Sequence, residues 1–232
     1  MKTVIIHGQS HEGSTCHIAR YLAEKIGGET EEFFLPRDFG EFCVGCGQCF
    51  LESEEKCPHA ALLQPFTRAL DSADVIILES PVYVYHVTGA MKAFLDHYGW
   101  RWMVHRPVEE MFHKQGVCIT TAAGSGNASA CKDLADSMFF WGIPKIYKYG
   151  KNVGALKWKD VSEKRKQKFK KDLDKMALRI RKKHGRVVPG FKTRGFFFIM
   201  QQLMRRGFNP KDIEYWENKG WLQKQRPWKE RT

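Results

Sequence analysis

Short apolar runs alternate with segments of helical period along the first two thirds of the chain. The runs VIIH and VIIL are apolar without alternation, which is typical of strands buried on both faces. The strand candidates are TVIIHG at 3–8, ETEEFFL at 29–35, DVIILES at 74–80, GVCITTA at 116–122 and KIYKY at 145–149. The pattern between them predicts helices over 14–26, 62–72, 89–97 and 128–140.

This order of elements predicts the fold class. Parallel neighbouring strands need a crossover connection, which is usually a helix, so strands that alternate with helices indicate a parallel sheet covered on both faces. In such sheets ligands bind beyond the carboxyl ends of the strands. We therefore look for functional residues in the loops that follow the strands.

The last third of the chain has a different pattern, amphipathic and strongly basic. Two apolar stripes at helical spacing are Phe169, Leu173, Met176 and Ile180, followed by Gly185, and then Phe196, Ile199, Met200 and Leu203. Residues 157–232 carry 24 Lys and Arg against 8 Asp and Glu, whereas residues 1–156 carry 14 against 18. The sequence thus predicts a core over 1–155 and a basic, aromatic-rich helical extension over 156–232.

Three partners suit such an extension. Its stripes can pack on the acidic core or on a second subunit, and the opposite charges of the two parts favour this interpretation. A basic amphipathic helix can also bind an anionic membrane surface. Nucleic acid is the least favoured partner, although basic faces with interleaved aromatic residues can bind it.

The lengths of the apolar runs and the number of cysteines indicate the cellular compartment of the protein. The apolar run at the N-terminus, Val4 to Ile6, is too short for a signal peptide, and no run reaches the ~18 residues of a membrane span. We therefore expect a soluble, cytoplasmic protein. In a reducing compartment seven cysteines, three of them spaced C-x2-C-x2-C, indicate metal or redox chemistry before disulfides.

Three loops after predicted strands have the composition of ligand sites. HGQSHEGST at 7–15 is small and polar at the start of a helix, where backbone N–H groups can converge on an anion; the alternative is an ordinary helix cap. It lacks the Walker A and dinucleotide-binding patterns. The loop after 74–80 presents Tyr83 and Tyr85, and TTAAGSGNAS at 120–129 is rich in small residues that allow backbone to approach a planar ligand.

Together these loops resemble the flavodoxin-like NAD(P)H-dependent FMN reductase family, including its iron–sulfur flavoprotein branch, over about residues 2–150. The motifs that carry the resemblance are SHEGST, the C-x2-C-x2-C loop with a further cysteine, SADVIILESPVYVYHVTGAMKAFLD and TTAAG. The chain departs from the family pattern at three places. A common arginine is missing from the first loop, where Glu12 stands, PHAA replaces the Asp-Asp that often follows the fourth cysteine, and His97 replaces an arginine.

The resemblance implies a flavodoxin-like sheet of order 2-1-3-4-5 with FMN at the point where the strand order reverses. By position, Ser10, Gly13, Ser14 and Thr15 would hold the phosphate. The isoalloxazine ring would be bordered by Pro81, Val82, Tyr83 and Val84 on one side and by Thr121, Ala123 and Gly124 on the other. Flavin sites in this family are often completed by a neighbouring subunit, so the resemblance also implies a homodimer.

Four cysteines, Cys43, Cys46, Cys49 and Cys57, leave three alternatives open: a [4Fe–4S] cluster, a zinc ion, or a metal-free loop. The spacing and the two nearby glycines suit a cluster, whereas the charged neighbours suit an exposed loop. Cys16, Cys118 and Cys131 fall in predicted helices or strands and are interpreted as small buried side chains. No histidines show ligand spacing, and we expect residues 97–107, with His97 and His105, beside the rim of the flavin pocket.

No catalytic side-chain constellation stands out, which suits a flavoenzyme whose cofactor performs the redox step. The favoured function is an FMN-dependent oxidoreductase in which NAD(P)H reduces the flavin and a quinone or other small molecule accepts the electrons. The alternative is an iron–sulfur flavoprotein or flavodoxin-like carrier that exchanges electrons with a protein partner. A third hypothesis is a flavin-free adaptor for a membrane surface or nucleic acid, which Glu12 in the phosphate loop keeps open.

Overall fold

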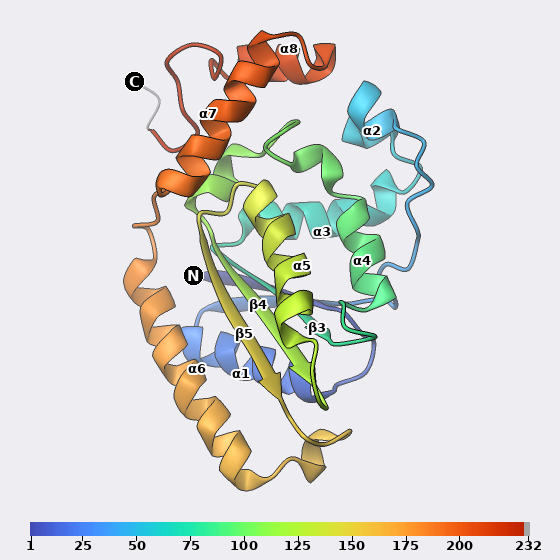
Figure 1. Ribbon diagram of the computed structural model, residues 1–232, viewed down its shortest axis with the longest axis vertical. Coiled ribbons are helices and arrows are strands. Elements are labelled where there is room, and N and C mark those ends of the chain that lie inside the picture. The colour runs from blue at the N-terminus through green and yellow to red at the C-terminus, as the bar shows by residue number, and fades with distance from the viewer. Residues whose placement is uncertain (230–232) are drawn as a thin grey trace.

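The computed structural model describes residues 1–229 and contains a five-stranded parallel sheet (Figure 1). The strand order is β2-β1-β3-β4-β5, as the resemblance implied. All four neighbouring pairs are parallel. The strands are β1 (Lys2–His7), β2 (Glu29–Phe34), β3 (Val75–Pro81), β4 (Gln115–Ala122) and β5 (Lys145–Asn152). The predicted doubly wound, flavodoxin-like architecture is confirmed.

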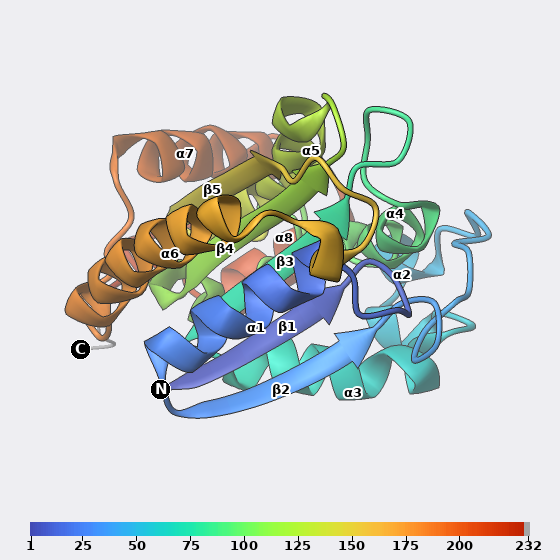
Figure 2. The ribbon, with the colours of Figure 1, turned by 90° about the horizontal axis from the view of Figure 1, so that it is seen from below.

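Helices cover both faces of this sheet. On one face α1 and α6 lie side by side, as Figure 2 shows, and α3, α4 and α5 cover the other. The helices are α1 (Ser14–Ile26), α2 (Gln48–Leu51), α3 (Ala60–Ser72), α4 (Gly89–Asp96), α5 (Asn127–Phe140), α6 (Glu163–Lys183), α7 (Phe191–Arg205) and α8 (Pro210–Asn218). The four helices predicted between the strands therefore form within a few residues of their expected bounds.

The packing of β1 explains why apolar and polar residues do not alternate along it. Successive side chains of a strand point to opposite faces. Val4 and Ile6 pack with the helices of one face, and Ile5 packs between α1 and α6 on the other. All three are fully buried. Since helices cover both faces, the three consecutive positions in the middle of β1 are all apolar.

The first apolar stripe of the extension packs on the core of the same chain. Phe169, Leu173 and Ile180 of α6 are buried against α1 and the sheet, with Ala177 at the same face. Met176, which the pattern placed in the stripe, is only half-buried at its edge. The division of the chain at residue 155 stays a prediction.

The second stripe is rotated from its predicted position. Helix α7 buries Phe197, Met200 and Met204, whereas Ile199 is 58% exposed. The prediction that Ile199 belongs to the buried stripe was wrong. The buried face was misplaced because it is set by a third core, which comprises Met103, Phe112, Phe197, Met200, Met204, Trp216 and Trp221.

The second half of residues 97–107 packs on this third core, through Met103 and Val104. The Trp216 indole donates from Nε1 to the His105 carbonyl at 2.6 Å, and the Tyr215 hydroxyl donates to the Pro107 carbonyl at 2.8 Å. In Figure 1 helices α7 and α8 lie at the top, away from the arrowheads of the strands. The expectation that residues 97–107 border the flavin pocket was therefore wrong, because Tyr98 and Trp100 are buried in the core of the sheet and the tail holds His105 and Pro107 at the other end.

Two further expectations concern burial and the membrane. Cys16, Cys118 and Cys131 are buried, as predicted. All seven cysteines are free. Over residues 1–229, none of the helices combines the length and the apolar character that a bilayer crossing requires.

A buried lysine beside β4 predicts a pH dependence of stability. Lys114 is 5% exposed and its Nζ donates to the Asp71 and Ala73 carbonyls at 2.7 and 2.5 Å. Burial lowers the pKa of Lys114 to about 8. The unfolded chain keeps this proton until about pH 10.4. Between these values the unfolded state binds more protons, so the free energy of unfolding rises with pH, by roughly 2–3 kcal/mol at most.

The measurement is urea unfolding at pH 7.5 and pH 9.5 for the wild type and Lys114→Met. Methionine fills the same space without a titrating group, so tyrosine and cysteine ionisation cancels in the difference. The wild type should gain about 1–2 kcal/mol relative to the variant over this interval. Equal changes in both proteins would show that Lys114 keeps an ordinary pKa.

Candidate functional site

The three loops predicted to hold a flavin meet around Thr121 at the end of β4. The Thr121 and Thr15 hydroxyls form a hydrogen bond at 2.8 Å. The Thr121 carbonyl accepts from the Val82 backbone N–H, also at 2.8 Å. The Thr88 hydroxyl donates to the Gly8 carbonyl at 2.5 Å, which joins the first loop to the start of α4. Segments distant in sequence thus form one surface at the carboxyl ends of β1, β3 and β4 (Figure 1).

The first loop has the features of an anion site. Helix α1 begins at Ser14 after Gly13 and has no side-chain cap, so the first N–H groups of the helix remain available. The Ser14 side chain is 7% exposed and its Oγ has no hydrogen-bond partner. A buried hydroxyl without a partner is costly, and a phosphate oxygen at the helix N-terminus would satisfy it. Ser10 is exposed, and its hydroxyl donates to the Leu35 carbonyl at 3.3 Å.

The charge of Glu12 is balanced within the chain. Its carboxylate pairs with the Arg20 guanidinium of α1 at 2.7 Å. This hydrogen bond lowers the pKa of Glu12, so the carboxylate is ionised but neutralised. Arg20 also pairs with Glu32 of β2 at 2.8 Å. The sequence could not reveal this partner, because the arginine lies two helical turns beyond the loop.

The loop after β3 holds two side chains in a strained backbone conformation. Val84 has φ 49° and Tyr85 has φ 68°, in the left-handed region that non-glycine residues rarely adopt, and a β-branched residue least of all. Val84 is 92% exposed, and Tyr83 and Tyr85 are exposed beside it. The Ser125 hydroxyl donates to the Tyr85 hydroxyl at 3.0 Å, which holds this loop against the loop after β4. Such strain is common at ligand sites.

The remaining predicted ring contacts lie around this surface. Pro81 and Val82 are half-buried at the end of β3, and Ala123 and Gly124 are exposed. A Cβ at Gly124 would meet no atom within 4 Å. The backbone there is open to a planar ligand. These residues therefore surround an open surface at the ends of β3 and β4.

A buried ionisable pair lies beneath the first loop, and no pattern along the chain indicated it. The His7 Nδ1 and Glu79 Oε1 atoms are 2.7 Å apart, and both side chains are fully buried. Burial raises the pKa of Glu79, against the effect of the hydrogen bond to His7. The pair comes from the ends of β1 and β3, so it fixes the two strands from which the ligand loops depart.

The cysteine loop leaves β2 and runs along the side of α4 towards α2 (Figure 1). Gly45 and Gly47 have φ of 67° and 73°, so these turns require glycine. All four cysteines of the loop line one cavity of about 250 Å³: Cys43, Cys46, Cys49 and Cys57. The donor set suits a metal or a cluster. Burial, with smaller contributions from neighbouring cysteines, raises the pKa of Cys49 to about 11, so a bound metal would be needed to hold it as a thiolate.

Two histidines line the same cavity, and sequence reasoning did not connect them. His59 Nδ1 and His97 Nε2 are 2.9 Å apart although the residues are 38 positions apart in sequence. His97 is buried, and burial lowers its pKa, so its ring is neutral at pH 7. Within residues 1–229, one set of three or more metal-binding side chains has all ligand atoms within 4.8 Å of one another: Cys57, His59 and His97.

Comparison with known proteins agrees with this geometry. The profile of a family described as NADPH-dependent FMN reductase matches residues 1–151. An iron-sulfur flavoprotein of Archaeoglobus fulgidus is 31% identical over 127 residues, which cover 53% of this chain and 54% of that protein. An iron-sulfur flavoprotein of Methanocaldococcus jannaschii is 36% identical over 76 residues, 33% of this chain and 37% of that protein. The chain thus spans about half the length, or less, of these curated relatives.

Solved structures share the fold at low sequence identity. An FMN-dependent NADH-azoreductase from Bacillus anthracis, solved in complex with FMN, has a TM-score of 0.56 at 14% identity, covering 78% of this chain and 100% of that one. An azoreductase from another strain of the same species has a TM-score of 0.59 at 11% identity, covering 76% and 98%. At these identities the similarity establishes the fold alone.

Proposed function

The chain belongs to the NADPH-dependent FMN reductase family, and from this membership we propose that it is an FMN-dependent oxidoreductase that oxidises NADH or NADPH. The electrons pass to a quinone or another small acceptor. When bound, FMN supplies the redox chemistry, taking a hydride from the nicotinamide and giving electrons to the acceptor.

The observation that carries this proposal is the buried Ser14 hydroxyl, which has no partner at the uncapped start of α1. In the proposal it donates to the FMN phosphate, together with Ser10, Thr15 and the backbone at Gly13. Residues 81–84 and Thr121, Ala123 and Gly124 border the ring. The exposed side chains of Tyr83, Val84 and Tyr85 suit cover by a second subunit, so a homodimer is part of the proposal.

A second candidate rests on the cavity that holds four cysteines. It is an electron carrier, with a flavin and a cluster, that serves a protein partner. Two relatives of this chain are named iron-sulfur flavoproteins, which supports this candidate. Binding of the basic tail to an anionic membrane stays a prediction.

The test is aerobic and anaerobic purification followed by a visible spectrum, iron and sulfide assays, and steady-state NADH and NADPH oxidation with a quinone. A reductase gives bound or reconstitutable FMN and turnover with the quinone alone. A carrier gives flavin, four irons per chain and little turnover until a partner is added. A protein that binds no FMN would contradict both and leave the adaptor hypothesis.

A further inference from the structure

We propose that Cys57, His59 and His97 form a mononuclear site for a divalent transition metal, with zinc as the ion. The site does not depend on the reductase activity proposed above. Two of its ligands are histidines outside the four-cysteine set, and its third ligand, Cys57, binds a single ion. A four-cysteine cluster and this site are therefore mutually exclusive at Cys57.

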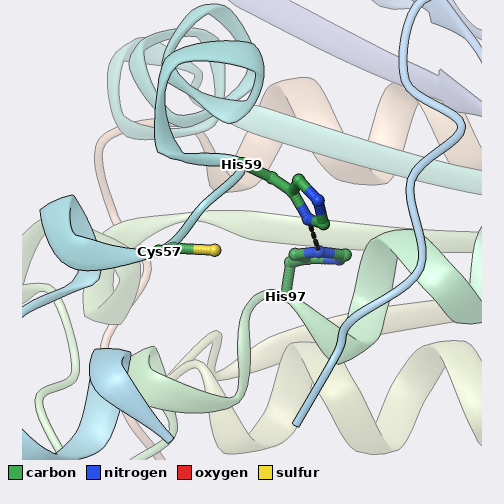
Figure 3. Close-up of side chains that lie close together, drawn as sticks. All are labelled: Cys57, His59 and His97. Carbon is green, nitrogen blue, oxygen red and sulfur yellow. Dashed lines mark hydrogen bonds between the residues drawn. The ribbon is translucent and has the colours of Figure 1, made fainter. Parts of the chain in front are cut away.

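The three donor atoms already face one another. Figure 3 shows the sulfur of Cys57 pointing towards the two imidazole rings. All ligand atoms lie within 4.8 Å of one another. Tetrahedral zinc, with bonds of about 2.0–2.3 Å, places its ligand atoms roughly 3.3–3.8 Å apart. Side-chain adjustments of about an ångström would complete the site.

The outer nitrogen of His97 is hydrogen-bonded to an oxygen, as in most metal-binding histidines, and that of His59 lies near a carboxylate. His97 donates from Nδ1 to the Ala93 carbonyl at 2.7 Å, which leaves Nε2 facing the site. His59 directs Nδ1 at the site, and its Nε2 lies 3.9 Å from the Glu41 carboxylate. The hydrogen bond to Ala93 thus fixes the tautomer of His97, and the Glu41 carboxylate is placed to accept from His59 Nε2 once a metal occupies Nδ1.

Metal binding requires a simple exchange of protons. Since His97 Nδ1 carries its proton, the neutral ring accepts at Nε2 from the Nδ1–H of His59, at 2.9 Å. The metal takes the place of that shared proton. The proton of His59 moves to Nε2, towards Glu41, and the thiol proton of Cys57 leaves to solvent.

The cavity and the donor types identify the ion. Thiolate and imidazole together suit zinc, whereas calcium and magnesium require oxygen ligands. The cavity of about 250 Å³ around the three ligands leaves room for water in the fourth position. The ion would join the C-terminal end of α4, at His97, to the segment before α3.

The test uses the full-length chain without a polyhistidine tag, reduced and stripped of metal, titrated with Co²⁺ and then with Zn²⁺ as competitor. One Co²⁺ per chain should give tetrahedral absorption and a thiolate-to-cobalt band that zinc abolishes. We expect Cys57→Ser, His59→Ala and His97→Gln each to weaken binding about 100-fold or more. Cys43→Ser should weaken it less than about 10-fold, and Glu41→Gln by about 10-fold.

His184→Ala is the matched control, because His184 is exposed at the end of α6 and outside the cavity, and it should bind as the wild type. If His97→Gln does not fold, the test rests on His59→Ala. The His59 side chain is only half-buried, so this variant should fold. Zinc should raise the Tm of the wild type and not that of His59→Ala. Cobalt binding unchanged in both histidine variants overturns the proposal, as do four irons that depend on Cys43 and persist without either histidine. FMN binding, measured on the same samples, reports the proposed function separately.

Discussion

Replacing Ser14 by aspartate is expected to weaken FMN binding about 100- to 1,000-fold. Ser14 begins α1, where the phosphate is proposed to bind, and its Oγ is buried without a partner. A carboxylate there repels the phosphate with an energy on the order of 4 kcal/mol at ~4 Å near a protein surface, and each 1.4 kcal/mol is about tenfold in affinity. An acidic residue in the first turn favours the helix, so the fold should persist.

Ser14→Ala separates the charge from the lost hydrogen bond. Removal of one hydrogen bond to a charged group should lower FMN affinity by roughly 10-fold. The flavin-free variant should be at least as stable as the wild type, because the buried hydroxyl has no partner to lose. Titration of flavin-free protein by the quenching of FMN fluorescence measures both variants. Wild-type affinity in Ser14→Asp would place the phosphate elsewhere.

Replacing Asp212 by alanine is expected to destabilise the protein by about 3–5 kcal/mol. Asp212 of α8 is fully buried and accepts from Arg106 at 2.6 Å and from His105 Nδ1 at 2.8 Å. Arg106 is 6% exposed and also donates to the carbonyls of Cys49 and Phe50. The variant would leave the buried guanidinium without its closest carboxylate, with Glu54 at 4.0 Å as the remaining one, and weakening the pairing of a buried charge is costly.

Urea unfolding measures this loss. Glu214→Ala on the same helix is the control, because Glu214 is exposed and its ion pair with Lys211 lies at the surface, so its change should stay within ~0.5 kcal/mol. FMN affinity should not change in Asp212→Ala at temperatures where it is folded, since α8 lies away from the flavin loops. Because Arg106 also holds the cysteine loop, cobalt affinity should fall. A variant as stable as the wild type would show that Arg106 is satisfied by solvent.

The flavodoxin-like core could be predicted from the sequence because the patterns that determine it lie within short stretches of the chain. Apolar runs such as VIIH and VIIL indicate strands covered on both faces, and helical periods between them impose parallel crossovers. The order of the strands and the family followed from loop motifs that lie at the carboxyl ends of these strands. The loops after β1, β3 and β4 meet at Thr121 because the same topology places the carboxyl ends of these strands at one edge of the sheet.

The tail was predicted less well, because an amphipathic period shows that a helix has a buried face without showing what covers it. In α7 the aromatic cluster of α8 and of residues 103–112 determined that face, so Ile199 is exposed and Phe197 is buried. Hydrogen bonds from the same cluster hold the end of residues 97–107 away from the flavin loops.

The sequence by itself determined the parallel sheet, the family and the set of loops that could hold FMN, because these depend on period and on residues close together in the chain. Only the tertiary structure decided which side chains far apart in sequence become neighbours. It paired Glu12 with Arg20 and His7 with Glu79, and it brought His59 and His97, two departures from the family pattern, to one cavity. The reason is physical: packing of helices on a sheet fixes such contacts, and no spacing along the chain records them.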